Sequence, residues 1–177
     1  LRAYAVVAVV LYHGGATSNL AGLAPGGFLG VSVFFTLSGY LVSTLLIRRS
    51  SSPGGLAIGQ FWARRLRRLA PVSIVVIAGA VLASSRFWPG LQWTEAAAGL
   101  FGWSNWNVII AGEDDLVRTI VGPLGPYWSL AVEEQFYVIL TVAVLIAWRT
   151  ARPLRTLSIF VAIGWASSLA VQILVSG

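Results

Sequence analysis

The sequence predicts an all-α fold: a polytopic bundle of about five transmembrane helices with one further interfacial or re-entrant helix. Of the 177 residues, 57% are hydrophobic and only 10% are charged. Soluble domains are nearer about 45–50% apolar and about 25% charged. Apolar runs of the length needed to cross a bilayer also recur along the chain. This composition needs lipid around it, so we expect the lipid bilayer to be its main partner.

The first predicted span is Leu1–Gly15, which is apolar apart from Arg2, Tyr12 and His13. The second is Gly26–Ile47, which is closed by two arginines. On the second span, small and hydroxyl residues recur at helical spacing, and we expect this stripe to face other helices rather than lipid. Its members are Ser32, Thr36, Gly39 and Ser43.

A basic stretch precedes the third predicted span. Phe61–Leu69 (FWARRLRRL) is predicted to be a short amphipathic helix, and Pro71 is expected to begin a new helix over Val72–Phe87. The basic residues of this stretch are Arg64, Arg65, Arg67 and Arg68.

The second half of the chain contains two further predicted spans, Trp128–Trp148 and Thr156–Leu174. Before them, Thr94–Ala111 has helical character but carries Glu95 and several tryptophans, which concentrate at membrane interfaces. We therefore predict an interfacial or re-entrant helix there, followed by the acidic run Glu113–Asp115.

The arginines predict the orientation in the membrane. With the N-terminus in the cytoplasm, ten of the twelve basic residues lie inside, and Glu95 and Glu113–Asp115 lie outside. This distribution satisfies the positive-inside rule. The formal net charge of +6 is thus attributed to membrane orientation, and we expect no nucleic-acid partner.

Composition excludes several kinds of site. The chain has no cysteine and one histidine, so thiolate nucleophiles and multi-histidine metal sites are excluded, and no metal is predicted. Phosphate-binding loops and the GxSxG motif of soluble hydrolases are also absent.

Three ionisable residues fall at bilayer depth: His13, Glu133 and Glu134. Such groups are costly in the membrane and usually mark a pathway or a site. A buried histidine kept neutral by desolvation suits a general base. Hydrogen bonding to a neighbouring helix is the structural alternative. On their helix the two glutamates point about 100° apart, so one is expected to face the bundle interior and the other a loop or the interface.

The four arginines near the third span are commonly a topology signal, but their forked guanidinium groups would also suit the phosphates of a nucleotide-like donor. Two other functions are considered. A transporter or flippase would use the histidine and glutamates as a proton relay, although no inverted repeat is found. A non-catalytic membrane scaffold would not need these residues.

Several motifs in order resemble the acyltransferase 3 family of membrane-bound O-acyltransferases. They are LRAYAVVAVVLYH, GGFLGVSVFFTLSGYLVS, FWARRLRRLAP, SNW and YWSLAVEEQFYVIL, and they cover most of residues 1–140. Two departures are noted. The family often has an acidic residue where Ser32 stands, and it has roughly twice as many spans. Together with the absence of methionine, this predicts that residues 1–177 form one membrane domain, the N-terminal part of a longer one.

The resemblance implies a bacterial, multi-pass cell-membrane enzyme that transfers an acyl group, often acetyl, from acyl-CoA to a hydroxyl of a carbohydrate or similar acceptor. No permanently bound cofactor is implied, because acyl-CoA is a donor substrate. Catalytic roles are implied for His13 and for Glu133 or Glu134. Donor binding is implied for Arg2 and for the basic stretch, Arg64, Arg65, Arg67 and Arg68.

Overall fold

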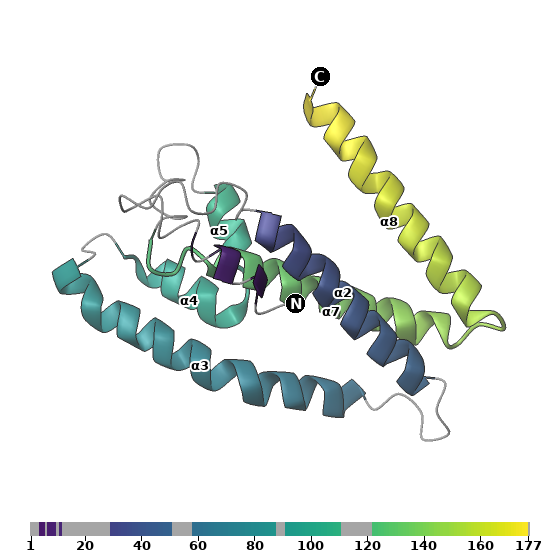
Figure 1. Cartoon of the computed structure of the whole chain (residues 1–177), viewed down its shortest axis with the longest axis horizontal. Coiled ribbons are helices and arrows are strands. Elements are labelled where there is room, and N and C mark those ends of the chain that lie inside the picture. Colours follow the sequence, from purple (N-terminus) through teal and green to yellow (C-terminus); the bar gives the residue numbers. More distant parts are fainter. Residues whose placement is uncertain are drawn as a thin grey trace.

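The structure consists of long helices with two short helices between them (Figure 1). The computed structural model describes residues 4–5, 7–9, 11, 29–50, 58–87, 91–110 and 122–176. Within these ranges there is no strand, which confirms the predicted all-α fold. The helices are α2 (Leu29–Ser50), α3 (Ile58–Phe87), α4 (Trp93–Phe101), α5 (Ser104–Ile110), α7 (Tyr127–Ala147) and α8 (Pro153–Ser176).

Four of these helices are long and apolar enough to cross a membrane, so this is a multi-pass membrane protein. They correspond to the second to fifth predicted spans and cover Leu29–Arg49, Ile58–Ser84, Tyr127–Ala147 and Pro153–Val175. Most of the first predicted span lies outside the described residues. Those of its residues that are described, in the range 4–11, are helical.

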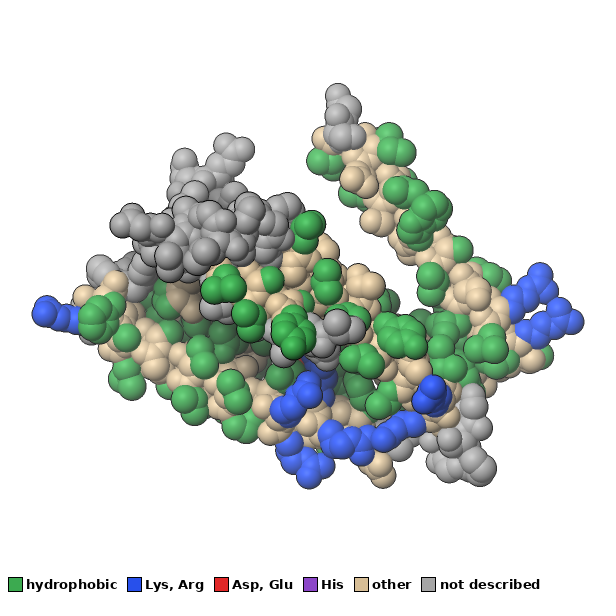
Figure 2. Space-filling model, in the orientation of Figure 1, with side chains coloured by type: hydrophobic (Ala, Val, Ile, Leu, Met, Phe, Trp, Pro, Cys, Tyr) green, Lys and Arg blue, Asp and Glu red, His purple; other side chains and the backbone are tan. Residues whose placement is uncertain are grey.

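Arginines gather at two places on the face shown in Figure 2, over the N-terminal half of α3 and at the turn between α7 and α8. The turn is formed locally. The Ala147 carbonyl at the end of α7 accepts hydrogen bonds from the Thr150 hydroxyl at 2.7 Å and from the Thr150 N–H at 3.0 Å. Pro153 then begins α8, where its missing N–H costs no helical hydrogen bond.

The basic stretch and the third span form one continuous helix, so the predicted helix start at Pro71 is wrong. Helix α3 runs through Pro71 for 30 residues. Proline in a helix interior removes one backbone hydrogen bond, but apolar helices in membranes tolerate this loss. The arginines of the basic stretch are therefore held rigidly on the same helix as the apolar span.

Residues Thr94–Ala111 do not form a spanning helix, as predicted. Helices α4 and α5 are separated by Gly102, whose φ of 76° lies in the left-handed region that glycine adopts without strain. Glu95 caps the start of α4 by accepting a hydrogen bond of 3.3 Å from the Gln92 N–H. The chain thus turns twice within a short distance and packs α4 against α3 and α5 against α7.

Helix α2 packs on α7 along a face that differs from the predicted stripe. Ser32 and Thr36 are exposed, so the prediction that they face neighbouring helices is wrong. The buried face is instead Ser38, Val42 and Leu46, at the i, i+4, i+8 spacing of one helical face. The last two join a core cluster with Tyr137, Leu140, Val144, Ala147 and Leu157.

A second, smaller core cluster joins Ile77 of α3, Ala96 of α4 and Leu124. Helix α8 contributes only its first turns to the first cluster, through Leu157. Beyond that point α8 diverges from the other helices (Figure 1), and its residues 158–175 are exposed. The two clusters therefore fix α2, α3, α4 and α7 around the site described below.

Gly30 brings the N-terminal residues against α2. A Cβ atom at Gly30 would lie 2.5 Å from the Ala5 carbonyl oxygen and 2.8 Å from Val9 Cγ2. We expect Gly30→Ala to lower the free energy of unfolding by about 1–3 kcal/mol, the usual cost of overpacking. Thermal unfolding in detergent measures this. Gly39→Ala is the matched control, because the nearest side chain, Phe136, would be 3.7 Å away. Equal unfolding temperatures for the two variants would contradict the packing.

Candidate active site

The site is centred on Arg65, which α3 buries while its neighbouring arginines stay at the surface. Arg64, Arg67 and Arg68 are exposed, whereas the Arg65 side chain is only 7% exposed. Helical geometry explains the difference, because Arg65 lies one turn beyond Phe61, which packs against the first core cluster. Arg65 therefore continues the face of α3 that is turned toward α7.

The Arg65 guanidinium binds two consecutive glutamates of α7. Its Nε donates to Oε1 of Glu134 at 2.7 Å, and Nη2 lies 2.7 Å from the same oxygen. Nη2 also lies 3.5 Å from Oε2 of Glu133. The Cζ atom is 4.1 Å from the centre of the Tyr137 ring, which is a cation–π distance. All three partners come from one stretch of α7, so Arg65 joins α3 to α7 at this level.

Tyr137 completes the cluster from within α7. It is fully buried, and its hydroxyl donates a hydrogen bond to Oε1 of Glu133, one helical turn earlier. Glu133 is 4% exposed and Glu134 is 24% exposed. Glu133 is therefore buried in the interior, and Glu134 is the more exposed of the two. Although they diverge on the helix, the long Arg65 side chain lies between them and reaches both.

Among the described residues, the cluster contains one guanidinium and two carboxylates. Burying charges is costly, and a buried ion pair persists only when its geometry and hydrogen bonds compensate for the lost hydration. Here each carboxylate has a charge-assisted contact, and the arginine stacks on an aromatic ring.

A pair of amides anchors α5 to α7 beside this cluster. Asn105 Nδ2 donates to Gln135 Oε1 at 3.2 Å, and Gln135 Nε2 donates to Asn105 Oδ1 at 2.9 Å and to the Gly102 carbonyl at 3.0 Å. The SNW and VEEQFY motifs, far apart in the sequence, thus meet in space. Gln135 directly follows Glu134, so the α4–α5 break is fixed relative to the ion-pair cluster.

The structure describes only some of the predicted site residues. Arg2 and His13 lie outside the described residues, so their positions remain predictions. Arg64, Arg67 and Arg68 present their side chains at the surface of α3, and Arg67 Nε donates to the carbonyl of Ala63 at 3.2 Å. In the described part of the chain, no three histidines or carboxylates gather as a metal site would require.

Sequence reasoning gave Tyr137 no role in the site. The signal was its spacing of four residues from Glu133, which allows a hydrogen bond along the helix. It also grouped Arg65 with three arginines that turn out to be exposed. The four-residue spacing of Phe61 and Arg65 puts both on one face of the helix, and this could have distinguished Arg65 from the other three arginines.

A polytopic helical bundle with a buried arginine–glutamate cluster defines a membrane protein with a buried polar site. The chain belongs to the acyltransferase 3 family, because the family model described as an acyltransferase domain matches residues 1–175. This confirms the predicted resemblance.

Two relatives are named for acyl transfer. The peptidoglycan O-acetyltransferase OatA of Listeria monocytogenes is 37% identical over 98% of this chain and 28% of its own length. The O-acetyltransferase OatA of Staphylococcus aureus is 36% identical over 86% of this chain and 25% of its own length. The chain thus spans about a quarter of these relatives. No solved structure matches it. These names describe acyl transfer rather than transport, so the transporter alternative is not favoured.

Proposed function

We propose that the protein is a membrane-bound O-acyltransferase that moves an acetyl group from acetyl-CoA to a hydroxyl group of a carbohydrate. The observation that carries the proposal is the buried contact of Arg65 with Glu133 and Glu134. It joins the basic stretch to the VEEQFY motif inside a helical bundle. The names of both relatives indicate acetyl as the group transferred, and the name of one indicates peptidoglycan as the acceptor.

The donor would be bound by the exposed arginines of α3, with Arg2 as a further donor ligand. Arg64, Arg67 and Arg68 lie three and four residues apart, so their side chains share one side of the helix. Guanidinium groups bind phosphates in forked geometry, and coenzyme A carries a pyrophosphate and a further phosphate. Arg65 is already bound to two carboxylates, so we assign it a positioning role within the donor-binding stretch.

The reaction would use His13 as the general base. The acceptor oxygen attacks the thioester carbonyl while His13 removes the hydroxyl proton. The new C–O ester bond forms, the C–S bond breaks, and the CoA thiolate receives the proton from His13. We propose that Glu133 or Glu134 orients His13 and stabilises its protonated form, because a nearby carboxylate favours the charged form of an imidazole.

Donor binding by the exposed arginines predicts a separation of kinetic constants. Arg64→Ala combined with Arg68→Ala should raise the KM for acetyl-CoA by about tenfold or more and change kcat little, because the lost contacts act equally in the ground and transition states. The assay is transfer of labelled acetyl from acetyl-CoA in membranes that contain the complete protein. Arg86→Ala is the matched control, an exposed arginine at the other end of the same helix. An equal KM for the variant and the control would contradict donor binding here.

The proposed mechanism needs the arginines of α3 on the cytoplasmic face, where acetyl-CoA is found. We expect cysteines introduced as Ser51→Cys and Gly112→Cys to react with an impermeant thiol reagent from opposite faces of the membrane, with Ser51→Cys on the cytoplasmic face. The background is clean, since the chain has no cysteine of its own. Labelling of both positions from one face would refute the N-in orientation.

A further inference from the structure

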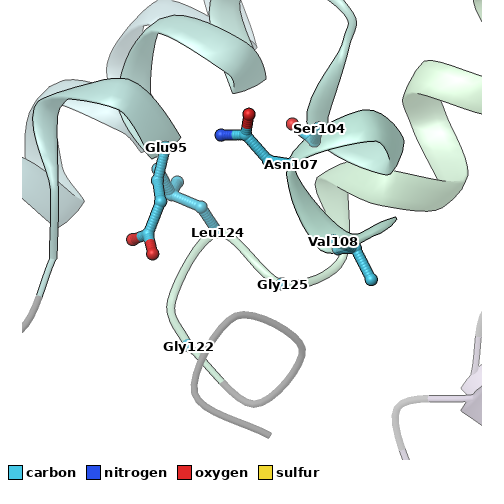
Figure 3. A pocket seen from close by; sticks show the side chains of 7 residues that line it. All are labelled: Glu95, Ser104, Asn107, Val108, Gly122, Leu124 and Gly125. Atoms are coloured by element: carbon cyan, nitrogen blue, oxygen red, sulfur yellow. The ribbon is translucent and has the colours of Figure 1, made fainter. Parts of the chain in front are cut away.

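A small polar cavity lies between α4, α5 and the turn before α7 (Figure 3). Its volume is about 20 Å³, enough for one group the size of a water molecule or a hydroxyl. Three elements contribute to it: α4, α5 and the turn before α7. The lining residues are Glu95, Ser104, Asn107, Val108, Gly122, Leu124 and Gly125.

The most informative lining residue is Ser104. Its side chain is 8% exposed, and its buried hydroxyl makes no hydrogen bond within the described part of the structure. A buried hydroxyl without a partner is unfavourable and is rare in native proteins. Its position on the cavity wall indicates that a bound group supplies the missing hydrogen bond.

The other polar groups of the cavity mainly accept hydrogen bonds. Asn107 donates through Nδ2 to the Thr94 carbonyl at 3.3 Å, which leaves its carbonyl oxygen without a partner among the described residues. Glu95 adds a carboxylate on the α4 side of the cavity (Figure 3). A hydroxyl group, which donates one hydrogen bond and accepts others, matches this set.

The cavity wall is held in place before any ligand binds. The turn at Gly102 accepts a hydrogen bond of 3.0 Å from Gln135, and Asn105 exchanges two hydrogen bonds with the same side chain. Ser104 lies between these two anchored residues. Since Gln135 follows Glu134 on α7, the cavity is fixed relative to the Arg65 cluster.

We propose that this cavity binds a hydroxyl group of the carbohydrate acceptor, which makes Ser104 and Asn107 acceptor-binding residues. The inference rests on the proposed function, which gives the chemical class of the acceptor. The cavity holds one hydroxyl, so it positions a single substituent of a larger glycan.

The kinetic test compares acceptor and donor constants in the complete protein. Soluble glycan strands prepared from peptidoglycan serve as the acceptor. Ser104→Ala should raise the KM for these strands by about fivefold to tenfold, as expected for one lost hydrogen bond, and leave the KM for acetyl-CoA unchanged. Ser158→Ala is the control, because that hydroxyl donates to the Leu154 carbonyl of its own helix. An unchanged acceptor KM for Ser104→Ala, or equal changes in both constants, would overturn the proposal.

A binding test separates this inference from the proposed function. The same glycan strands should raise the unfolding temperature of the detergent-solubilised wild-type protein, and the rise should be smaller for Ser104→Ala and Asn107→Leu. This readout needs no turnover, so it stands even if acetyl-CoA is not the donor. Equal rises for the wild type and both variants would show that the glycan binds elsewhere and would overturn the assignment.

Discussion

Replacing His13 by alanine in the complete protein is expected to reduce kcat for acetyl transfer by about 10²–10⁴-fold, the usual cost of losing a general base. The chain has one histidine, so no other imidazole within it can take over. The KM for acetyl-CoA should change little, because donor binding is assigned to arginines. Measurement of initial rates with labelled acetyl-CoA at matched protein levels gives both constants.

The His13 result distinguishes a base from a structural residue. If His13 only joined two helices, His13→Ala would lower the unfolding temperature and the amount of folded protein, and the remaining folded protein would be active. Full activity per folded molecule would remove the base assignment. Partial recovery of His13→Ala by added imidazole would support it, because the free base could then accept the hydroxyl proton.

Arg65→Ala is expected to destabilise the protein by about 3–5 kcal/mol, because removing one partner of a buried ion pair is costly. Glu133 and Glu134 would both lose their ion pair, and the Tyr137 ring would lose its stacked cation. The unfolding temperature in detergent reports this loss. Arg64→Ala is the matched control, since Arg64 is exposed one residue away and should change stability by less than about 0.5 kcal/mol.

Adding Glu133→Gln and Glu134→Gln to Arg65→Ala should recover part of the lost stability, because the uncompensated charges are removed with the arginine. The positioning role of Arg65 would be contradicted if Arg65→Ala were no less stable than Arg64→Ala. In that case, an increase only in the KM for acetyl-CoA would return Arg65 to the donor-binding group.

Hydrophobic run lengths were sufficient to locate the spans, because a membrane helix must satisfy its backbone within itself and fill the bilayer with apolar side chains. Helix α7 begins and ends within one residue of the predicted Trp128–Trp148. The start of α3 was missed because proline at a helix start and proline inside a membrane helix look alike in a local sequence. The continuity of α3 depends on the packing of both of its halves.

Residues of the candidate site could be predicted from the sequence, but their arrangement in space could not. The sequence identified Arg65, Glu133 and Glu134 as unusual, but Arg65 and Glu134 are 69 residues apart, and only the packing of α3 on α7 brings them together. For a similar reason, helix α2 buries the face that contains Ser38 and not the predicted stripe that begins at Ser32. Several faces of an apolar helix can pack equally well in lipid, and the partner helix selects one of them.

Acetyl transfer in oriented membrane vesicles tests the central claim most directly. Sealed vesicles of both orientations, prepared with the complete protein and containing peptidoglycan strands as the acceptor, receive labelled acetyl-CoA from outside only. We expect labelled ester on the glycan when the face that bears Arg64 and Arg68 is exposed to the donor, and none in vesicles of the other orientation. The account would be contradicted if glycan in neither orientation were labelled while the folded protein was present in both.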